Sequence, residues 1–404
     1  MTRFQKQLRF LNWEFGVFFH FGIRTFYEGH TDWDMKEMPA QGFTPDRLQC
    51  DGWIKTAKEA GARYAILVCK HHDGFANWPT KYSDYSVAAT PWKNGKGDVV
   101  REFTDACRKY GLGVGLYYSP AQFGSVKMNA KEYDDYFINQ VSELLGLYGK
   151  LDYLWFDGCG SENHEYDTER IVKEIRRLQP DIMLFNMWDP DTRWIGNEAG
   201  VADLNNPLTV DRLDFSVLTT NKDRLKEALF LPAECDCRIR KQWFYSDADR
   251  TRLKSLEQLK GMYLSSVGRG ANLLLNVGPD RHGEILKEDA DRLREFGDWL
   301  KSTFETPIKK VENPELSDGV FTLSMDEETP VNYVVLQEEL SKDRAVTSFE
   351  IQLSPQDFGE NVTVYLGKTI GHKAICPLPS LCGRSITVKI NGTNQPKLES
   401  IALF

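Results

Sequence analysis

Several apolar stretches of this chain end in a carboxylate, a histidine or an aromatic residue. The clearest is the stretch 153–158 (YLWFDG), in which four apolar or aromatic residues precede Asp157 and a glycine. So apolar a run is typical of an inner strand of a parallel sheet, covered on both faces. In a barrel of parallel strands, chemistry is placed at the carboxyl ends of the strands. Asp157 could simply cap the next turn, but its position among other polar strand ends predicts a nucleophile.

Polar residues follow the other apolar stretches as well. Taken singly, each could be a structural residue that hydrogen-bonds a neighbouring loop. Together on one rim they predict a polar pocket with aromatic walls. Neutral histidine, tyrosine and asparagine suit hydroxyl groups, which both donate and accept hydrogen bonds, so we expect a polyhydroxylated ligand such as a sugar. The residues are His20, His71, His72, Tyr118, Asn186, Glu234 and Asn276.

Two acids come from different parts of the predicted barrel and could flank a single bond. Asp157 ends the fourth predicted strand, and Glu198 lies in the long segment after the fifth. A retaining glycosidase needs two carboxyl groups about 5 Å apart, one as the nucleophile and one as the acid and base. Asp157 and Glu198 are therefore candidates for such a pair, with one acid attacking the anomeric carbon and the other protonating the leaving oxygen.

Metal binding is the main alternative. His20, His71, His72 and Asp157 could be ligands of a hydrolytic zinc site. Against this, adjacent side chains on an extended strand point to opposite faces, and the first strand has no H-x-H pattern. We therefore expect neither a metal nor another cofactor.

The order of elements indicates an α/β protein. Strands alternate with helices over the first three quarters of the chain, which favours a (β/α)8-like barrel over residues 1–304. A doubly wound sheet is the rival fold, but it would use only its switch point, whereas polar residues follow nearly every strand here. The irregular segment 188–225 is long enough to be functional. Strands are expected at 15–21, 64–69, 113–118, 153–157, 182–186, 228–234 and 271–277, and helices at 51–61, 98–110, 135–148, 168–178, 257–267 and 286–300.

Residues 305–404 have a different pattern. Short runs rich in valine, isoleucine and threonine, separated by Gly, Pro and Asn, predict an antiparallel β-sandwich. No cluster of aromatic residues suggests a binding surface there, so we expect this domain to brace the barrel. The runs are 331–336, 347–353, 362–366 and 385–390.

Composition narrows the possible partners. The net charge is −9 with no long block of one sign, which argues against nucleic acid. The eight cysteines are scattered and are expected to be reduced thiols. Neither a signal peptide nor a membrane-spanning stretch is recognised, so the chain as given is expected to be cytoplasmic, with no membrane partner. The sequence leaves open whether the chain forms a homo-oligomer.

The motifs HHDGF at 71–75 and WFDG at 155–158 resemble those of the α-L-fucosidases of glycoside hydrolase family 29. The resemblance runs nearly end to end, from FGVFFHFG at 15–22 to VNYVVLQEEL at 331–340. It implies a distorted (β/α)8-like barrel followed by a β-sandwich, and hydrolysis of α-L-fucosides with retention and without a cofactor. It also implies that Asp157 is the nucleophile. The fucose contacts that it implies are His20, His71, His72, Tyr118 and Trp155.

The segment RWIGNEAG at 193–200 is similar to the branch of the family that cleaves α-1,3 and α-1,4 fucosyl linkages. That resemblance makes Glu198 the acid/base, with Glu234 as the alternative, and places Arg193 in sugar binding. Glu234 and Asp236 would then assist a neighbouring galactose site.

The chain departs from that branch just after these two acids. Cys237-Arg238 and Lys241-Gln242 stand where Val-Ser and Pro-Gly are expected. The preferred leaving group is therefore open. A broad-specificity fucosidase acting on simple or α-1,2 fucosides, and a non-catalytic fucose-binding protein, are the alternatives. The expected partner is a fucosylated oligosaccharide or glycoconjugate.

Overall fold

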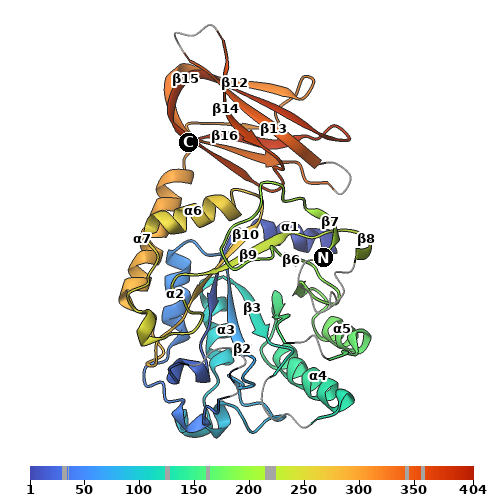
Figure 1. The fold of residues 1–404 in the computed structure, drawn as a ribbon, viewed down its shortest axis with the longest axis vertical. Coiled ribbons are helices and arrows are strands. Elements are labelled where there is room, and N and C mark those ends of the chain that lie inside the picture. Colours follow the sequence, from blue (N-terminus) through green and yellow to red (C-terminus); the bar gives the residue numbers. More distant parts are fainter. Residues whose placement is uncertain are drawn as a thin grey trace.

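The computed structural model describes residues 1–29, 34, 36–122, 128–160, 164–213, 224–341, 345–355 and 360–404. A parallel barrel sheet occupies the larger part, and a separate antiparallel sheet lies at one end of it (Figure 1). None of the helices in the described ranges combines the length and the hydropathy that crossing a membrane requires.

Eight parallel strands form the nearly closed barrel that the sequence predicted. They lie in the order β5-β4-β3-β2-β1-β10-β9-β6, and a parallel bridge between Phe185 and Thr192 links the two ends of this order. The strands are β1 (Phe15–Phe19), β2 (Tyr64–Lys70), β3 (Gly113–Tyr118), β4 (Tyr153–Phe156), β5 (Met183–Phe185), β6 (Arg193–Trp194), β9 (Ala233–Arg238) and β10 (Asn272–Val277).

Seven α-helices accompany the strands in the described part of the chain. The six predicted helices are present, and α3 illustrates why: the Asp98 side chain accepts a hydrogen bond from Arg101 N at 2.8 Å, and Gly111 ends the helix at φ 67°. The helix α1, which was not predicted, starts with a capping box and buries Phe10 in the interior of the barrel. The helices are α1 (Arg3–Leu11), α2 (Cys50–Glu59), α3 (Val99–Tyr110), α4 (Ala130–Leu147), α5 (Thr168–Leu178), α6 (Leu256–Ser266) and α7 (Lys287–Phe304). Short 3-10 helices lie at Ile23–Phe26, Ala40–Gly42, Val87–Ala89, Trp92–Gly95 and Asp247–Asp249.

Two hydrophobic layers pack against the barrel strands, one inside the barrel and one between the sheet and the helices. Phe18, Tyr117, Trp155 and Leu274 pack together inside the barrel, whereas Tyr118 packs in the outer layer between the sheet and the helices. Because side chains alternate along a strand, residues of one parity face the interior and those of the other face the helices. This alternation decides which side chains can reach a site at the barrel mouth.

The sixth predicted strand, 228–234, is wrong in its position. Its first residues belong to β8 (Arg224–Phe230), which pairs antiparallel with β7 (Thr209–Arg212), while the barrel strand β9 begins only at Ala233. Pro232, which lacks a backbone N–H, lies between the two strands. Glu234 is therefore near the start of its barrel strand and not at its end. The rest of the irregular segment, 214–223, lies outside the described residues.

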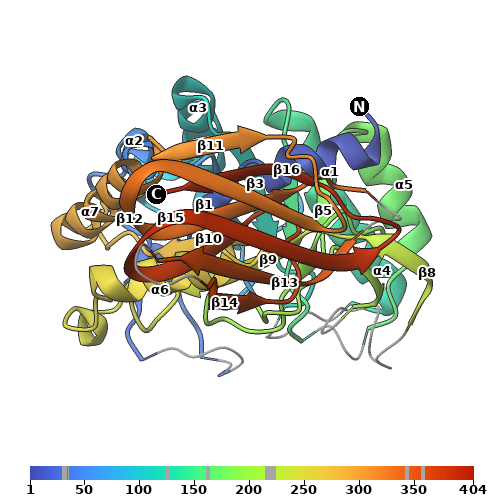
Figure 2. The same ribbon diagram turned by 90° about the horizontal axis from the view of Figure 1, so that it is seen from above.

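The C-terminal part is one hydrogen-bonded antiparallel sheet with its own apolar core, in the order β11-β16-β12-β15-β13-β14. The long strands β12 and β15 contain register shifts and bend across the layer, as Figure 2 shows from above. Ile375 N donates to Gly268 O at 3.0 Å and ties this sheet to the barrel. The strands are β11 (Lys309–Glu312), β12 (Val320–Glu338), β13 (Ala345–Ser354), β14 (Val362–Gly367), β15 (Ala374–Thr393) and β16 (Leu398–Leu403).

Candidate active site

A cavity of about 190 Å³ lies at the carboxyl ends of the barrel strands. This volume is below the ~300–1,000 Å³ of clefts that hold drug-sized ligands and suits a single sugar ring. Residues from most of the barrel strands and the segments after them reach it, because inward-facing side chains converge at the mouth of a barrel. It is lined by Phe18, His20, His71, His72, Tyr117, Trp155, Phe156, Asp157, Gly158, Cys159, Phe185, Asn186, Trp194, Glu198, Asp236 and Trp243.

Asp157 follows β4 and has the same parity as the inward-facing Trp155. Its Oδ1 accepts a hydrogen bond from Cys159 N at 2.9 Å, and its Oδ2 accepts one from the Tyr117 hydroxyl at 2.8 Å. Both carboxylate oxygens are thus oriented by groups of the pocket floor. A carboxylate held in this way presents a fixed oxygen to a ligand in the cavity.

His71 and His72 both line the cavity, although adjacent residues of a strand would point to opposite faces. The reason is that β2 ends at Lys70 and the two histidines lie in a turn, in which Gly74 N donates to His71 O at 3.0 Å. Gly74 has a φ of 85°, a conformation that favours glycine. The two imidazole centroids are 4.3 Å apart. The sequence argument that separated them is therefore wrong.

Hydrogen bonds fix the tautomer of His20. Its Nδ1 lies 2.7 Å from Asn276 Oδ1, and Asn276 Nδ2 donates to Trp243 O at 2.7 Å. The Asn276 oxygen must therefore accept, so His20 carries its proton on Nδ1 and offers Nε2 to the cavity as an acceptor. Burial lowers the pKa of His20 to about 3, which keeps the ring neutral.

Ser119 fixes His72 by the same logic. The Ser119 hydroxyl donates to Ala121 O at 2.7 Å, so its oxygen accepts from His72 Nδ1, which is 2.6 Å away. The second nitrogen, His72 Nε2, lies 3.5 Å from Asp157 Oδ2. When His72 is neutral, two acceptors face each other there. A hydroxyl of a ligand could donate to either of them.

His71 has the opposite tautomer. Its Nδ1 lies 3.3 Å from Arg24 Nη1, and a guanidinium only donates, so Nδ1 accepts and the proton is on Nε2. Burial, together with the neighbouring His72 and Arg24, holds the pKa of His71 well below its usual range. The ring stacks on Tyr117 with centroids 5.7 Å apart. The three histidines thus supply two acceptors and one donor in fixed directions.

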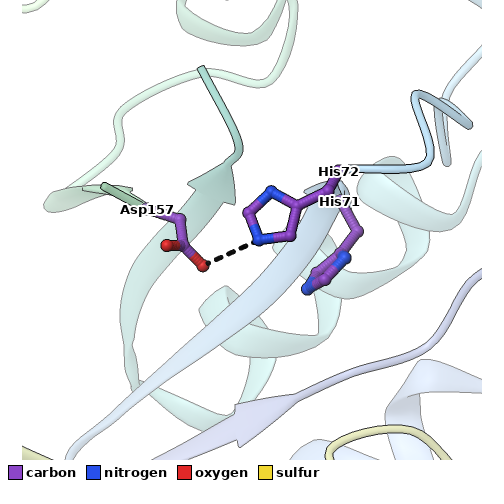
Figure 3. Close-up of side chains that lie close together, drawn as sticks. All are labelled: His71, His72 and Asp157. Atoms are coloured by element: carbon purple, nitrogen blue, oxygen red, sulfur yellow. Dashed lines mark ion pairs between the residues drawn. The ribbon is translucent and has the colours of Figure 1, made fainter. Parts of the chain in front are cut away.

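The group His71, His72 and Asp157 brings its possible ligand atoms within 4.8 Å of one another, so its spacing alone would permit a metal ion (Figure 3). The hydrogen bonds suit a metal poorly, because His71 Nδ1 already accepts from the Arg24 guanidinium and Nε2 carries the proton. The guanidinium also places a positive charge beside this group. The donor set therefore fits hydroxyl groups better than a cation.

Glu198 stands at the outer edge of the cavity, and its side chain is 45% exposed. Ala199 forms an antiparallel bridge with Cys237, which holds this segment against the end of β9. Arg238, the last residue of β9, places Nη2 at 3.2 Å from Glu198 Oε2. Asp157, which follows β4, and Glu198, in the segment after β6, thus line one cavity.

Asp236 and Glu234 share the inward face of β9 but lie at different depths. Asp236 lines the cavity, and its Oδ1 accepts from Trp194 Nε1 at 2.7 Å. Burial, together with the charges of Glu198 and Glu234, raises the pKa of Asp236 to about 8, so it is protonated at neutral pH. Asp236 can therefore donate a hydrogen bond to a ligand.

Glu234 lies below the cavity and does not line it. Its Oε1 accepts from Trp155 Nε1 at 2.9 Å and its Oε2 from the Tyr64 hydroxyl at 2.5 Å. Burial raises the pKa of Glu234 to about 7. Since it contacts Trp155 from beneath, Glu234 positions a wall of the pocket and does not reach a ligand in it.

Two further residues of the sequence prediction lie elsewhere. Tyr118 faces the helices and donates to Gln140 Oε1 at 2.7 Å, while Tyr117 takes the place that was expected for it. The sequence contained a signal for this exchange, because Tyr117 shares its parity with Gly113 and Gly115, which leave room inside the barrel for larger neighbours.

Arg193 points into a different hollow, where it donates to Asn206 Oδ1 and Pro207 O. Trp194 belongs to the segment RWIGNEAG at 193–200 but was given no role of its own, while Trp243 and Arg24 lie in no motif that would reveal them.

Comparisons with known proteins agree on one family. A family model described as alpha-L-fucosidase matches residues 5–305. Alpha-L-fucosidase 1 of Arabidopsis thaliana is 31% identical, over 90% of this chain and 80% of that protein.

Solved structures match over nearly the whole chain. A glycoside hydrolase 29 family member from an unknown rumen bacterium superposes with a TM-score of 0.88 at 29% identity, covering 99% of this chain and 76% of that one. A Ruminococcus gnavus GH29 fucosidase in complex with fucose has a TM-score of 0.85 at 27% identity, covering 99% and 94%.

Proposed function

Because this chain belongs to the alpha-L-fucosidase family, glycoside hydrolase family 29, we propose that it removes terminal α-1,3- or α-1,4-linked L-fucose from glycans with retention of configuration. The chain is a glycoside hydrolase, an α-L-fucosidase. The observation that carries the finer proposal is the cavity of about 190 Å³ that Asp157 and Glu198 both line. A cavity of this size at the barrel mouth suits one terminal sugar, with the rest of the glycan outside.

In the proposed first step, an Asp157 oxygen attacks the anomeric carbon of fucose. The bond from that carbon to the leaving oxygen breaks, and the leaving oxygen takes a proton from Glu198. The product is a fucosyl ester of Asp157 with inverted configuration. The hydrogen bonds from Tyr117 and Cys159 hold the attacking carboxylate in place.

In the second step, the ionised Glu198 takes a proton from water, and the water oxygen attacks the same carbon. The bond to Asp157 breaks, so the carboxylate is regenerated and fucose leaves with its original configuration. Glu198 is suited to both steps because it lies at the outer edge of the cavity, where leaving group and water enter.

The proposed recognition of fucose rests on the fixed tautomers. His20 Nε2 and His72 Nε2 accept from sugar hydroxyls, while His71 Nε2 and the protonated Asp236 donate to them. The aromatic wall suits the methyl group of fucose, since a hydroxymethyl there would lose its hydrogen-bond partners. Tyr118 and Arg193 have no part in this arrangement.

Azide separates the two catalytic roles. We expect Asp157→Ala to lose turnover of an aryl α-L-fucoside by roughly 10³-fold or more, and azide to restore it as the inverted fucosyl azide. For Glu198→Ala, azide should attack the ester intermediate and give the retained azide. Rescue of Glu234→Ala or Asp236→Ala in place of Glu198→Ala would move the acid/base role to that residue, and full activity of Asp157→Ala would refute the nucleophile.

The proposed linkage preference rests on the resemblance of the segment 193–200 to the α-1,3/1,4-specific branch. Glu198 of this segment lines the cavity, and Ala199 pairs with Cys237. The measurement is kcat/KM on Lewis-type trisaccharides, on an α-1,2-fucosylated disaccharide and on an aryl fucoside. Preference for the trisaccharides is expected. Equal turnover of all three would favour a broad-specificity enzyme.

A further inference from the structure

A second hollow of about 670 Å³ adjoins the sugar cavity on the side of Glu198. Glu198 lines both spaces, so a leaving group that takes its proton from Glu198 must lie next to this hollow. Five of the residues around the hollow are cationic, and Glu198 is its only acidic lining residue within the described ranges. We call it the basic hollow, and it is lined by Glu198, Ala199, Arg238, Arg240, Lys241, Arg252, Leu253, Lys254, Gln258 and Met262.

Three of the five cations have partners: Arg238 forms the ion pair with Glu198 described above, and Arg240 and Lys254 have structural partners. Arg240 forms an ion pair with Asp289 at 2.6 Å, and Lys254 Nζ donates to the carbonyl oxygens of Arg238 and Arg240 at 2.5 and 3.2 Å. These contacts hold the chain after β9 in place. These contacts explain why Arg240 and Lys254 lie here, but not why the other cations line the hollow.

Arg238, Lys241 and Arg252 form the rest of the positive lining. Lys241 and Arg252 are exposed, and Arg238 lies between Glu198 and the ring of Trp243, 5.0 Å from the ring centroid. The nearby acid Asp249 is already engaged, since its Oδ2 accepts from the backbone of Lys241 and Gln242 at 2.8 and 2.7 Å. The whole chain carries a net charge of −9, so this local excess of positive charge runs against the general sign of the protein.

We propose that the basic hollow binds an anionic group, a sulfate ester or a carboxylate, on the sugar next to the fucosylated unit. This inference rests on the proposed function and names its substrate class. Arginine and lysine suit both groups, since each presents several acceptor oxygens.

The test compares kcat/KM for four substrates: a neutral Lewis-type trisaccharide, its galactose-sulfated form, its sialylated form and an aryl fucoside. We expect the two anionic glycans to exceed the neutral trisaccharide by roughly threefold to tenfold at low salt, because exposed charge pairs contribute modestly. The advantage should shrink at about 0.5 M NaCl, where such charges are screened. A preference for only one anionic glycan would support the proposal and identify the source of the anion.

The double variant Lys241→Gln, Arg252→Gln should lose the anionic advantage and keep its turnover of the aryl fucoside. The matched control is Lys58→Gln, an exposed lysine of α2, which should change neither. Two outcomes would overturn this inference and leave the proposed function intact. One is turnover of the aryl fucoside with no preference for the anionic glycans, and the other is a preference that survives in the double variant. Failure to cleave any fucoside would instead overturn the proposed function.

Discussion

The two ends of the barrel use buried charge in opposite ways. At the amino end, next to the C-terminal sheet, Glu14 has a lysine and a histidine as partners: Lys373 Nζ donates to its Oε1, and His372 Nε2 lies 3.4 Å away. Burial alone would raise the pKa of Glu14, but Lys373 and His372 more than offset this and lower it to about 2. The charge is compensated, and the contact ties two sheets together.

From the interior of the barrel to its carboxyl end, the acids of β9 have neutral hydrogen-bond partners. Asp236 accepts from Trp194, and Glu234 accepts from Trp155 and Tyr64. Burial therefore prevails and raises the pKa of Asp236 to about 8 and that of Glu234 to about 7. A buried carboxyl group with a cation stabilises the fold, whereas one with neutral donors keeps a proton available for a ligand.

Among the substitutions that test this contrast, Glu14→Gln should have the largest effect. We expect Glu14→Gln to reduce the free energy of unfolding by about 2–3 kcal/mol and to leave kcat/KM on an aryl fucoside unchanged, because it removes one partner of a partly buried charge cluster. The pKa of Glu14 is depressed in the folded state, so its contribution is present above about pH 4.5 and is lost as the pH falls towards 2.

Denaturant unfolding of both proteins between pH 7 and pH 3 measures this difference. The control is Glu257→Gln, whose side chain is 79% exposed and should matter little. A stability difference that does not narrow at low pH would show that Glu14 acts through something other than its charge.

The two tyrosines at the end of β3 face opposite sides of the barrel sheet, Tyr117 inward and Tyr118 outward. Tyr117→Phe removes the hydrogen bond to Asp157 and should lower kcat/KM by roughly tenfold or more. Tyr118→Phe removes a hydrogen bond to Gln140 in the outer layer, and should cost about 1 kcal/mol of stability with little change in kcat/KM. The reverse pattern would mean that the parity of β3 is not as described.

Substitution of Arg24 is expected to have a smaller effect on activity, because Arg24 acts only by positioning His71. Arg24→Met should raise KM by roughly threefold to tenfold, because His71 is then free to adopt either tautomer. Its positive charge helps to lower the pKa of His71, so the acidic limb of the pH profile should move to higher pH in the variant. Arg24→Lys keeps the charge and should restore the limb. An unchanged profile in Arg24→Met would rule out this positioning role.

The smallest expected effect is that of Asp236→Asn below pH 8. Wild-type Asp236 is protonated there, and asparagine also donates, so kcat/KM should change by only about threefold or less. As the pH rises through 8, the wild type should lose activity with the proton of Asp236, whereas the variant should not. If the alkaline limb remains in Asp236→Asn, that limb belongs to Glu198 or Glu234.

The barrel and most of its strands could be predicted from the sequence alone. The catalytic roles of Asp157 and Glu198 stay predictions. Apolar runs, helix caps and the motifs HHDGF and WFDG are local features, and local features can be recognised from neighbouring residues. The position of Asp157 at the barrel mouth was expected because it directly follows the apolar run 153–156, where a buried strand ends.

The packing of the whole fold sets which side of a strand faces the site and how deep each residue lies. A shift in the start of β9 moved Glu234 beneath the pocket and left Asp236 at its wall, and a one-residue change of parity exchanged Tyr118 for Tyr117. The cluster of Glu14 with His372 and Lys373 joins residues more than 350 positions apart. Such contacts depend on how distant elements pack, and no local pattern specifies them.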